Sequence, residues 1–371
     1  MLPSERRYDI DWVRVIAIGL LLIYHVAIGF QAWGIMIGFI VNEKTWESLW
    51  IPMMMLNVWR IPLLFFVSGM GVYFAIQNRN WKQLLQERAG RILLPFLCGI
   101  FLIVPIHLYI WRYYYQFEMT YTPNPGHLWF LGNIFVYVII LSPVIFYLKK
   151  NENGKIVKGI KKILSTPLGL IPVIAAFIAE AFIVDPMPYE MYAMTWHGFF
   201  LGLLAFFFGF CFVLSGDPFW KMILKWRWFF FSTAVILFTL RLFQFKMNTP
   251  MYLLVTESDC WIISVFAFGY KYLNRPSKTL SYLSQAAYPV YIVHMIFLYL
   301  GSLLIFPLDI GVSFQFVLVL MFTGVGCFAL YELVIRRVNF IRPLFGLKMR
   351  GNVITQRRKG EYMNSGASHS G

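Results

Sequence analysis

The chain of 371 residues is 59% hydrophobic and only 13% charged, whereas soluble domains carry about 25% charged residues. This composition excludes an ordinary soluble enzyme and predicts an integral membrane protein. The formal charge of +15 would suit a nucleic-acid partner, but the positions of the basic residues, described below, argue against one.

Ten apolar segments have about the 20 residues that a helix needs to cross roughly 30 Å of hydrocarbon. In chain order they are 13–39, 52–76, 93–113, 127–148, 167–184, 191–214, 228–247, 250–273, 281–305 and 311–335. The first is too long for a cleavable signal peptide, and no small-residue cleavage site follows it. The sequence therefore predicts an all-α integral membrane protein with about ten transmembrane helices, in one membrane domain over 1–348. The polar residues 349–371 are expected to form a disordered tail.

Lysine and arginine gather on one side of these segments. Of the 32 such residues, all but five fall in the parts of the chain that ten crossings place on the same side as the N-terminus. Three of the exceptions lie on the other side, and two, Arg60 and Arg241, lie inside apolar segments. Because cytoplasmic loops of membrane proteins are rich in basic residues, both termini are predicted to be cytoplasmic. The basic charge reports this topology, and no nucleic-acid partner is expected.

Five of the six histidines map to the half of the membrane away from the termini when depth is counted at about 1.5 Å per residue. They are His25, His107, His127, His197 and His294. For His107 and His197 taken singly, a hydrogen-bonded core histidine is the simpler interpretation. Because ionisable groups in a bilayer are costly unless paired or hydrated, a polar cavity open to the outside explains the five together better.

Arg14 and His25 lie at the two ends of an apolar stretch in the first segment. Because each residue turns a helix by about 100°, the separation of eleven residues brings His25 back to within roughly 20° of the direction of Arg14. The two residues are then about 16 Å apart along the helix axis. Asp11 lies on the same stripe and can form an ion pair with Arg14. Arg88 and Arg91, one turn apart before the third segment, can clamp a phosphate or pyrophosphate. Anchoring at a basic interface explains these two arginines equally well.

Further polar residues lie in or near apolar segments. "GHLWFL" carries His127 and Trp129, which interfacial anchoring also explains, and "YPVYIVH" carries Tyr291 and His294. Asp259 can orient a histidine or neutralise Arg241.

Three other acids and four cysteines also lie within apolar segments. They are Glu180, Glu257 and Glu332, and Cys98, Cys211, Cys260 and Cys327. Glu332 is expected to form a structural ion pair whose partner stays open. The cysteines have no paired spacing, which favours core positions over disulfides or metal ligands. No metal is expected.

Four motifs in chain order resemble the membrane-bound acyltransferase 3 family, whose members are ten-helix O-acyltransferases of sugars and surface glycans. They are "DWVRVIAIGLLLIYH", which holds Arg14 and His25, then "RIPLLFFVSGMG", "ERAGR" and "HLWFL". The likeness extends over about residues 6–348. Within the family, "IRRVNFIRPLFG" near the C-terminus is most similar to the osmoregulated periplasmic glucan succinyltransferases.

The resemblance implies transfer of an acyl group from cytoplasmic acyl-CoA, either acetyl-CoA or succinyl-CoA, to a hydroxyl of an extracytoplasmic glycan or other sugar. It also implies a multi-pass protein of the inner membrane, with His25 as general base or transient acyl carrier. The residues expected for catalysis are His25, Arg14 and His294, and those expected for donor binding are Arg88, Arg91 and Arg14. Substrate binding is expected at His127, Trp129, Arg60 and Tyr291. Structural ion pairs are expected at Asp11, Glu332 and Asp259. A succinyl carboxylate would need a further cation, for which Arg60 and Arg241 are both open.

Two other functions fit parts of the pattern. A secondary transporter or flippase for a glycan-related or anionic substrate would suit the broken segments and buried charges, but the chain shows no internal repeat and no paired interrupted helices. A non-catalytic assembly protein for glycan export would tolerate loss of His25. Only the acyltransferase would consume acyl-CoA, so measuring this consumption distinguishes it from the transporter and from the assembly protein.

Overall fold

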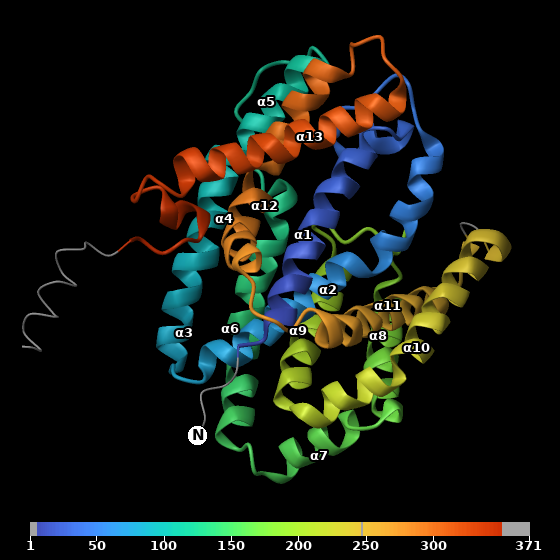
Figure 1. Ribbon diagram of the computed structural model, residues 1–371, viewed down its shortest axis with the longest axis vertical. Helices are drawn as coiled ribbons and strands as arrows, with labels where there is room; N and C mark the ends of the chain where they lie inside the picture. Colours follow the sequence, from blue (N-terminus) through green and yellow to red (C-terminus); the bar gives the residue numbers. More distant parts are fainter. Residues whose placement is uncertain (1–5, 246–247, 351–371) are drawn as a thin grey trace, which may run out of the picture.

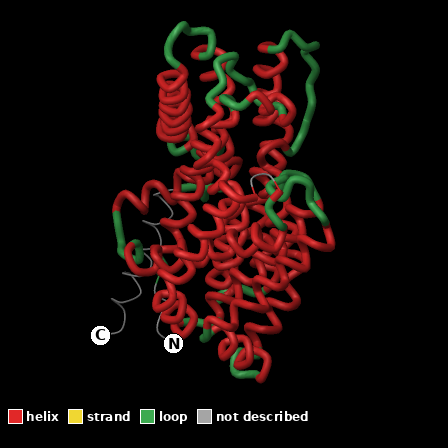
Figure 2. The backbone as a smooth tube through the Cα atoms, turned by 90° about the vertical axis from the view of Figure 1, so that its right-hand side faces the viewer, coloured by secondary structure: helices red, strands yellow, loops and turns green. Residues whose placement is uncertain are grey.

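The computed structural model describes residues 6–245 and 248–350, and all the regular structure in them is helical (Figure 2). Ten helical runs are long and apolar enough to cross a membrane. They are Tyr8–Ile28, Glu47–Ile76, Trp81–Tyr114, Gly126–Lys150, Pro167–Val184, Trp196–Leu214, Asp217–Phe245, Met251–Tyr272, Lys278–Ile305 and Val312–Ile335. The predicted all-α membrane fold is thus confirmed. Most of the expected tail, from residue 351, lies outside the described residues.

Most runs are single helices, and some begin or end in a short 3₁₀ or π segment. The elements are α1 (Tyr8–Ile28), η1 (Ala32–Ile37), η2 (Glu47–Leu49), α2 (Trp50–Ile76), α3 (Trp81–Arg88), η3 (Ala89–Leu93), α4 (Leu94–Cys98), η4 (Gly99–Ile103), α5 (Val104–Tyr114), η5 (Gly126–Leu128), α6 (Trp129–Lys150), α7 (Lys155–Leu164), η6 (Pro167–Leu170), α8 (Ile171–Val184), α9 (Trp196–Leu214), α10 (Asp217–Leu240), η7 (Arg241–Phe245), α11 (Met251–Tyr272), α12 (Lys278–Ile305), α13 (Val312–Leu330), η9 (Tyr331–Ile335) and η10 (Arg342–Phe345).

The first span ends earlier than predicted. A helix to residue 39 was expected, but α1 stops at Ile28 and the chain folds back over its end. The amide of Asn42 donates to the carbonyl of Gly29, and that of Trp46 to the carbonyl of Phe30. The apolar pattern continues past the helix into a segment that is only partly buried: Ile40 is fully enclosed, whereas Ile35 and Met36 are exposed.

The third span begins earlier than predicted, at Trp81, and contains two π segments, η3 and η4. Each precedes a helix that has a proline at its start, Pro95 in α4 and Pro105 in α5. Proline has no amide hydrogen, so the carbonyl four residues before it loses its helical partner. The carbonyl of Phe101, four residues before Pro105, instead accepts from the Tyr121 hydroxyl at 2.9 Å.

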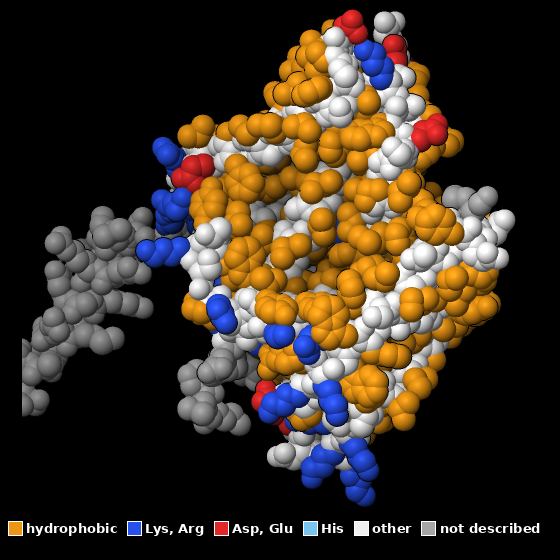
Figure 3. All heavy atoms as spheres, turned by 45° about the vertical axis from the view of Figure 1, so that its right-hand side comes forward, with side chains coloured by type: hydrophobic (Ala, Val, Ile, Leu, Met, Phe, Trp, Pro, Cys, Tyr) orange, Lys and Arg blue, Asp and Glu red, His pale blue; other side chains and the backbone are white. Residues whose placement is uncertain are grey.

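α1 lies in the middle of the bundle. It packs against α2, α11, α12 and α13, and Figure 1 shows it between α12 and α2. We call the side of the bundle that holds the start of α1, the end of α2 and α7 the basic side. Figure 3 shows lysine and arginine gathered along the lower and left edges of one face, around a broad hydrophobic surface that is hollowed in its middle. α1 therefore connects the basic side to the interior.

The tightest helix contact joins α2 to α9 through two glycines. A methyl group at Gly69 would overlap the carbonyl oxygen of Phe206, and one at Gly209 would overlap the carbonyl oxygen of Phe66. Small residues let membrane helices approach at backbone distance, where packing is the main attraction between them. This contact holds α2, which carries Arg60, in a fixed position.

Replacing Gly209 by valine should destabilise the folded protein by about 1–3 kcal/mol, because the added methyl groups meet the α2 backbone rather than a movable side chain. Gly324→Val in α13 is the matched control, since nothing lies within 4 Å of a Cβ built there. Thermal unfolding of the detergent-solubilised variants measures the difference. Equal melting temperatures for the two variants would show that the α2–α9 contact is not as tight as described.

Candidate functional site

Four histidines meet in the interior of the bundle, and we call them the histidine cluster: His25 of α1, His107 of α5, His127 of η5 and His294 of α12. The ring centroids of His127 and His294 are 4.9 Å apart, and those of His107 and His127 are 5.5 Å apart. His294 is fully buried, whereas His25 is partly exposed. The expected gathering of histidines therefore holds for these four, including His107, for which a solitary core position was the simpler expectation.

Hydrogen bonds assign the proton positions of the central pair. The Nδ1 of His294 lies 2.6 Å from the carbonyl oxygen of Tyr291, and a carbonyl only accepts, so this Nδ1 carries the proton. The Nε2 of neutral His294 then accepts from the Nδ1–H of His25 at 2.8 Å. The Nε2 of His25 is left with its lone pair free. His294 thus holds the ring of His25 in place through this hydrogen bond.

His127 and Tyr291 connect the histidine cluster to the part of α12 that follows Pro289. The Nε2 of His127 donates to the carbonyl of Ile292 at 3.0 Å, and the Tyr291 hydroxyl donates to the carbonyl of His127 at 2.5 Å. Two of the expected substrate-binding residues therefore bind each other across the η5–α12 contact. Trp129, the third, lies at the start of α6 and packs against Phe65.

A second cluster lies at the basic side, and we call it the arginine cluster: Arg14, Arg88 and Arg91. The guanidinium of Arg14 lies next to Gly71 of α2, and the Nη2 of Arg88 donates to the Gly71 carbonyl at 3.4 Å. Arg91 is half-exposed, and its charge acts on both other arginines. The three predicted donor-binding residues are therefore brought together from two different spans.

Glu87 is an acid of the arginine cluster, and the sequence interpretation missed it. Its carboxylate lies 2.9 Å from Arg91 Nη1 and 3.4 Å from Arg88 Nε. The spacing of four residues to Arg91 was the available signal. Asp11 also lies 3.5 Å from Arg14, so two carboxylates face three guanidinium groups and the cluster keeps a net positive charge.

Two of the acids expected in ion pairs have a basic partner. Asp11 lies 3.5 Å from Arg14, and it also accepts from Arg6 at 3.0 Å. Glu332 pairs with Arg336, one turn along, at 2.8 Å.

The third predicted pair is wrong. Arg241 is neutralised by Glu257, at 2.8 Å, and lies 3.6 Å from Glu190; Asp259 contacts neither Arg241 nor a histidine in the described residues. Two residues apart on α11, Glu257 and Asp259 point about 200° apart around the helix axis. Only Glu257 is directed at Arg241 of η7.

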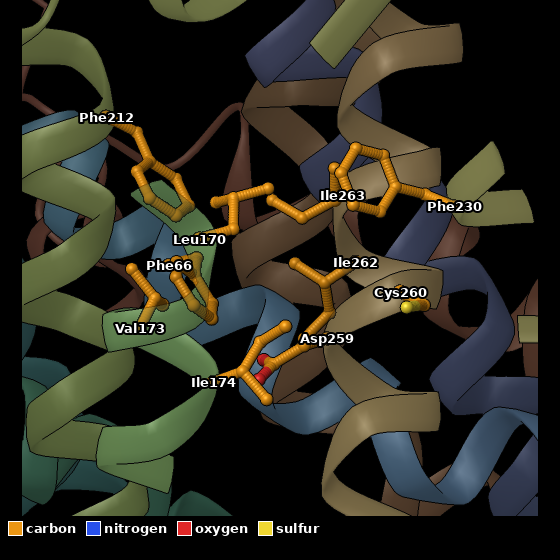
Figure 4. A pocket seen from close by; sticks show the side chains of 10 residues that line it. All are labelled: Phe66, Leu170, Val173, Ile174, Phe212, Phe230, Asp259, Cys260, Ile262 and Ile263. Atoms are coloured by element: carbon orange, nitrogen blue, oxygen red, sulfur yellow. The ribbon is translucent and has the colours of Figure 1, made fainter. Parts of the chain in front are cut away.

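Asp259 instead borders a small apolar cavity between α2, α8, α9, α10 and α11 (Figure 4). Its Oδ2 has no hydrogen-bond partner among the described residues, and Figure 4 shows the carboxylate beside Ile174. The cavity offers about 10 Å³, roughly the space of one water. It is too small for a substrate.

His197 does not join the histidine cluster. It is buried at the start of α9, and its Nδ1 lies 3.0 Å from Glu180 of α8. Its ring stacks on Tyr192, whose hydroxyl donates to the carbonyl of Val58 in α2. The simpler interpretation of His197 as a hydrogen-bonded core residue fits these contacts.

A larger groove of about 360 Å³ lies between α1, α2, α10 and α11. Side chains such as Ile16, Trp59 and Phe268 make it almost wholly apolar, and no histidine lines it. It runs beside the stripe of α1 that carries Arg14 and His25. Within residues 6–245 and 248–350, no group of three or more His, Cys, Asp or Glu side chains is placed to hold a metal ion.

The fold and the two clusters together define a multi-pass α-helical membrane protein with a histidine pair inside and a positive site at one end. A family model described as an acyltransferase domain matches residues 7–332, and the chain belongs to this acyltransferase 3 family. It is therefore a membrane acyltransferase. No curated protein and no solved structure gives a match. The closer likeness to glucan succinyltransferases stays a prediction.

Replacing the acid of the buried pair Arg241–Glu257 should lower stability more than replacing the acid of the exposed pair Arg336–Glu332. Glu257→Gln leaves the buried Arg241 with a weaker partner, and breaking a buried pair costs about 3–5 kcal/mol. Glu332→Gln breaks an exposed pair and should change stability little. Thermal unfolding in detergent compares the two. Equal small shifts would mean that Arg241 does not depend on Glu257.

Proposed function

We propose that the protein transfers an acetyl or succinyl group from acyl-CoA, bound at the basic side, to a hydroxyl of a glycan or other sugar on the opposite side of the inner membrane. The basic side is then cytoplasmic. The observation that supports this best is α1 itself, an unbroken helix that carries Arg14 within the arginine cluster and His25 within the histidine cluster. Eleven residues separate the two by about 16 Å.

The arginine cluster suits the nucleotide end of acyl-CoA. Phosphates prefer forked guanidinium donors, and Arg91 is half-exposed toward the basic side. The thin pantetheine arm then follows the Arg14 stripe of α1 inward and brings the thioester to His25. The phosphate charge stays at the interface, and the arm enters the hydrocarbon region with the acyl group at its end.

His25 has the position and the free lone pair for the transfer step. Its Nε2 takes the proton of the sugar hydroxyl while the hydroxyl oxygen attacks the thioester carbonyl. The ester bond forms, the thioester C–S bond breaks, and the imidazolium returns its proton to the departing thiolate. His294 positions His25 through the 2.8 Å bond. A transient acyl group on His25 is the alternative, which labelled enzyme trapped without acceptor would reveal.

The acceptor reaches the cluster from the side opposite the arginines. We assign its binding to the surroundings of His127, Tyr291 and Trp129, with Arg60 nearby. The rival function, a transporter or flippase, predicts no consumption of acyl-CoA.

His25→Asn should lower acyl transfer by on the order of 10²–10⁴-fold, the usual contribution of a general base. Asparagine keeps a donor for His294 but has no basic nitrogen. Purified protein in lipid vesicles, given radiolabelled acetyl-CoA or succinyl-CoA and added glucans, reports the label transferred.

The matched control is His197→Asn, which keeps a donor for Glu180 outside the histidine cluster and should retain transfer. If His25→Asn transfers label as fast as His197→Asn, His25 is not the base. If wild type consumes neither donor, the enzyme proposal itself fails and transport assays follow.

Replacing Arg88 and Arg91 together by glutamine should raise the KM for acyl-CoA by about 10-fold or more, because charge-assisted contacts to phosphate are lost. A truncated acyl-pantetheine donor lacks those phosphates, so its kinetics should be the same in variant and wild type. Arg227→Gln, also on the basic side, serves as the control. A KM that rises equally for both donors would place these arginines outside the phosphate site.

A further inference from the structure

Arg60 is a buried cation without a counterion. Its side chain lies in the middle of α2 and is fully enclosed, and none of its three guanidinium nitrogens has a hydrogen-bond partner in the described residues. Arginine stays charged in proteins, and a charge inside a bilayer costs several kcal/mol unless it is paired. Such a group needs an anion that the described residues do not supply.

The other arginine within the spans shows what a satisfied position looks like. Arg241 is equally buried, but it lies 2.8 Å from Glu257, 3.6 Å from Glu190 and 2.8 Å from the carbonyl of Met54. From the sequence, either Arg60 or Arg241 could be the cation that binds a succinyl carboxylate. The contacts favour Arg60, because Arg241 already has its carboxylates.

The contact that Arg60 makes with an aromatic ring leaves its N–H donors unused. The guanidinium carbon lies 3.8 Å from the centre of the Tyr24 ring, so one face of the group is covered. The groups that act most on its charge are the phenols of Tyr24 and Tyr192, not carboxylates. A cation–π contact contributes roughly 0.5–2 kcal/mol and uses none of the N–H donors. These donors form the planar fork that binds a carboxylate in two places.

Arg60 is also a neighbour of the reacting centre. Tyr24 precedes His25 in α1, and their ring centroids are 6.0 Å apart. The same Tyr24 ring covers the guanidinium of Arg60, so one side chain lies next to both groups. An acyl group whose carbonyl is at His25 therefore has a cation within reach of its far end.

We propose that Arg60 binds the terminal carboxylate of a dicarboxylic acyl group, so that the enzyme selects a succinyl-type donor over acetyl. Tyr24 positions the guanidinium by stacking on it. This inference rests on the proposed acyl transfer and names its donor class. An acidic group on the sugar acceptor would offer the same chemistry, and the test separates the two sources.

The experiment compares kcat/KM for succinyl-CoA and acetyl-CoA, with a neutral glucan as acceptor, in vesicle-reconstituted protein. Wild type should prefer succinyl-CoA by on the order of 10- to 100-fold, as expected for charge-assisted hydrogen bonds. Arg60→Gln should lower the succinyl-to-acetyl ratio by a similar factor, and Arg60→Lys by less. Arg112→Gln, an arginine of the α5 end, should leave the ratio as in wild type.

Competition in wild type gives a second readout that needs no variant. Free succinate should inhibit transfer at lower concentration than propionate, which has one carboxylate. A wild type that uses both donors equally, or an Arg60→Gln variant that loses both in parallel, overturns the inference. A preference for acidic over neutral acceptors with acetyl-CoA also overturns it and moves the anion to the acceptor. Failure with every donor refutes the proposed acyl transfer instead.

Discussion

Polar side chains inside a membrane need partners within the protein, and this constraint governs how the helices of this chain meet. Each buried polar pair joins two elements: His25 with His294 links α1 to α12, His197 with Glu180 links α9 to α8, and Arg241 with Glu257 links η7 to α11. A hydrogen bond between membrane helices contributes only about 1–2 kcal/mol. Its larger effect is on register, because a shift of one residue rotates a helical side chain by 100° and leaves two polar groups unsatisfied.

Arg60 and Asp259 are exceptions to this constraint, and they differ in kind. The carboxyl of Asp259 has an unpartnered oxygen beside a cavity with room for about one water. A carboxyl group can take up a proton and become neutral, which removes most of the cost of burial. A guanidinium cannot do so. Missing partners therefore do not mark a binding site by themselves; a permanent charge without a counterion, beside a reactive histidine, is a stronger indication.

Hydropathy alone predicted the ten spans, and helical spacing predicted that Arg14 and His25 share a face, because both depend on local sequence. The end of α1 was predicted wrongly, since a partly buried loop has the same apolar composition as a helix. The choice between Glu257 and Asp259 as partner of Arg241 could not be made, because it depends on which face of α11 meets its neighbour. The role of Tyr24 as the platform for Arg60 likewise needs the α1–α2 packing.

Backbone groups fix the position of the histidine pair: a carbonyl of α12 holds His294, and the regular helix α1 carries His25. His294 is held by the carbonyl of Tyr291 in its own helix, two residues after Pro289, and the ring of His127 is held by the next carbonyl, that of Ile292. His25 lies on an unbroken α-helix whose other end is held in the arginine cluster. Sites on regular helices are placed more exactly than sites on loops. Under the proposed function, a donor anchored by its phosphates at Arg14 would present its far end at a fixed depth, which is set by the length of α1 between Arg14 and His25.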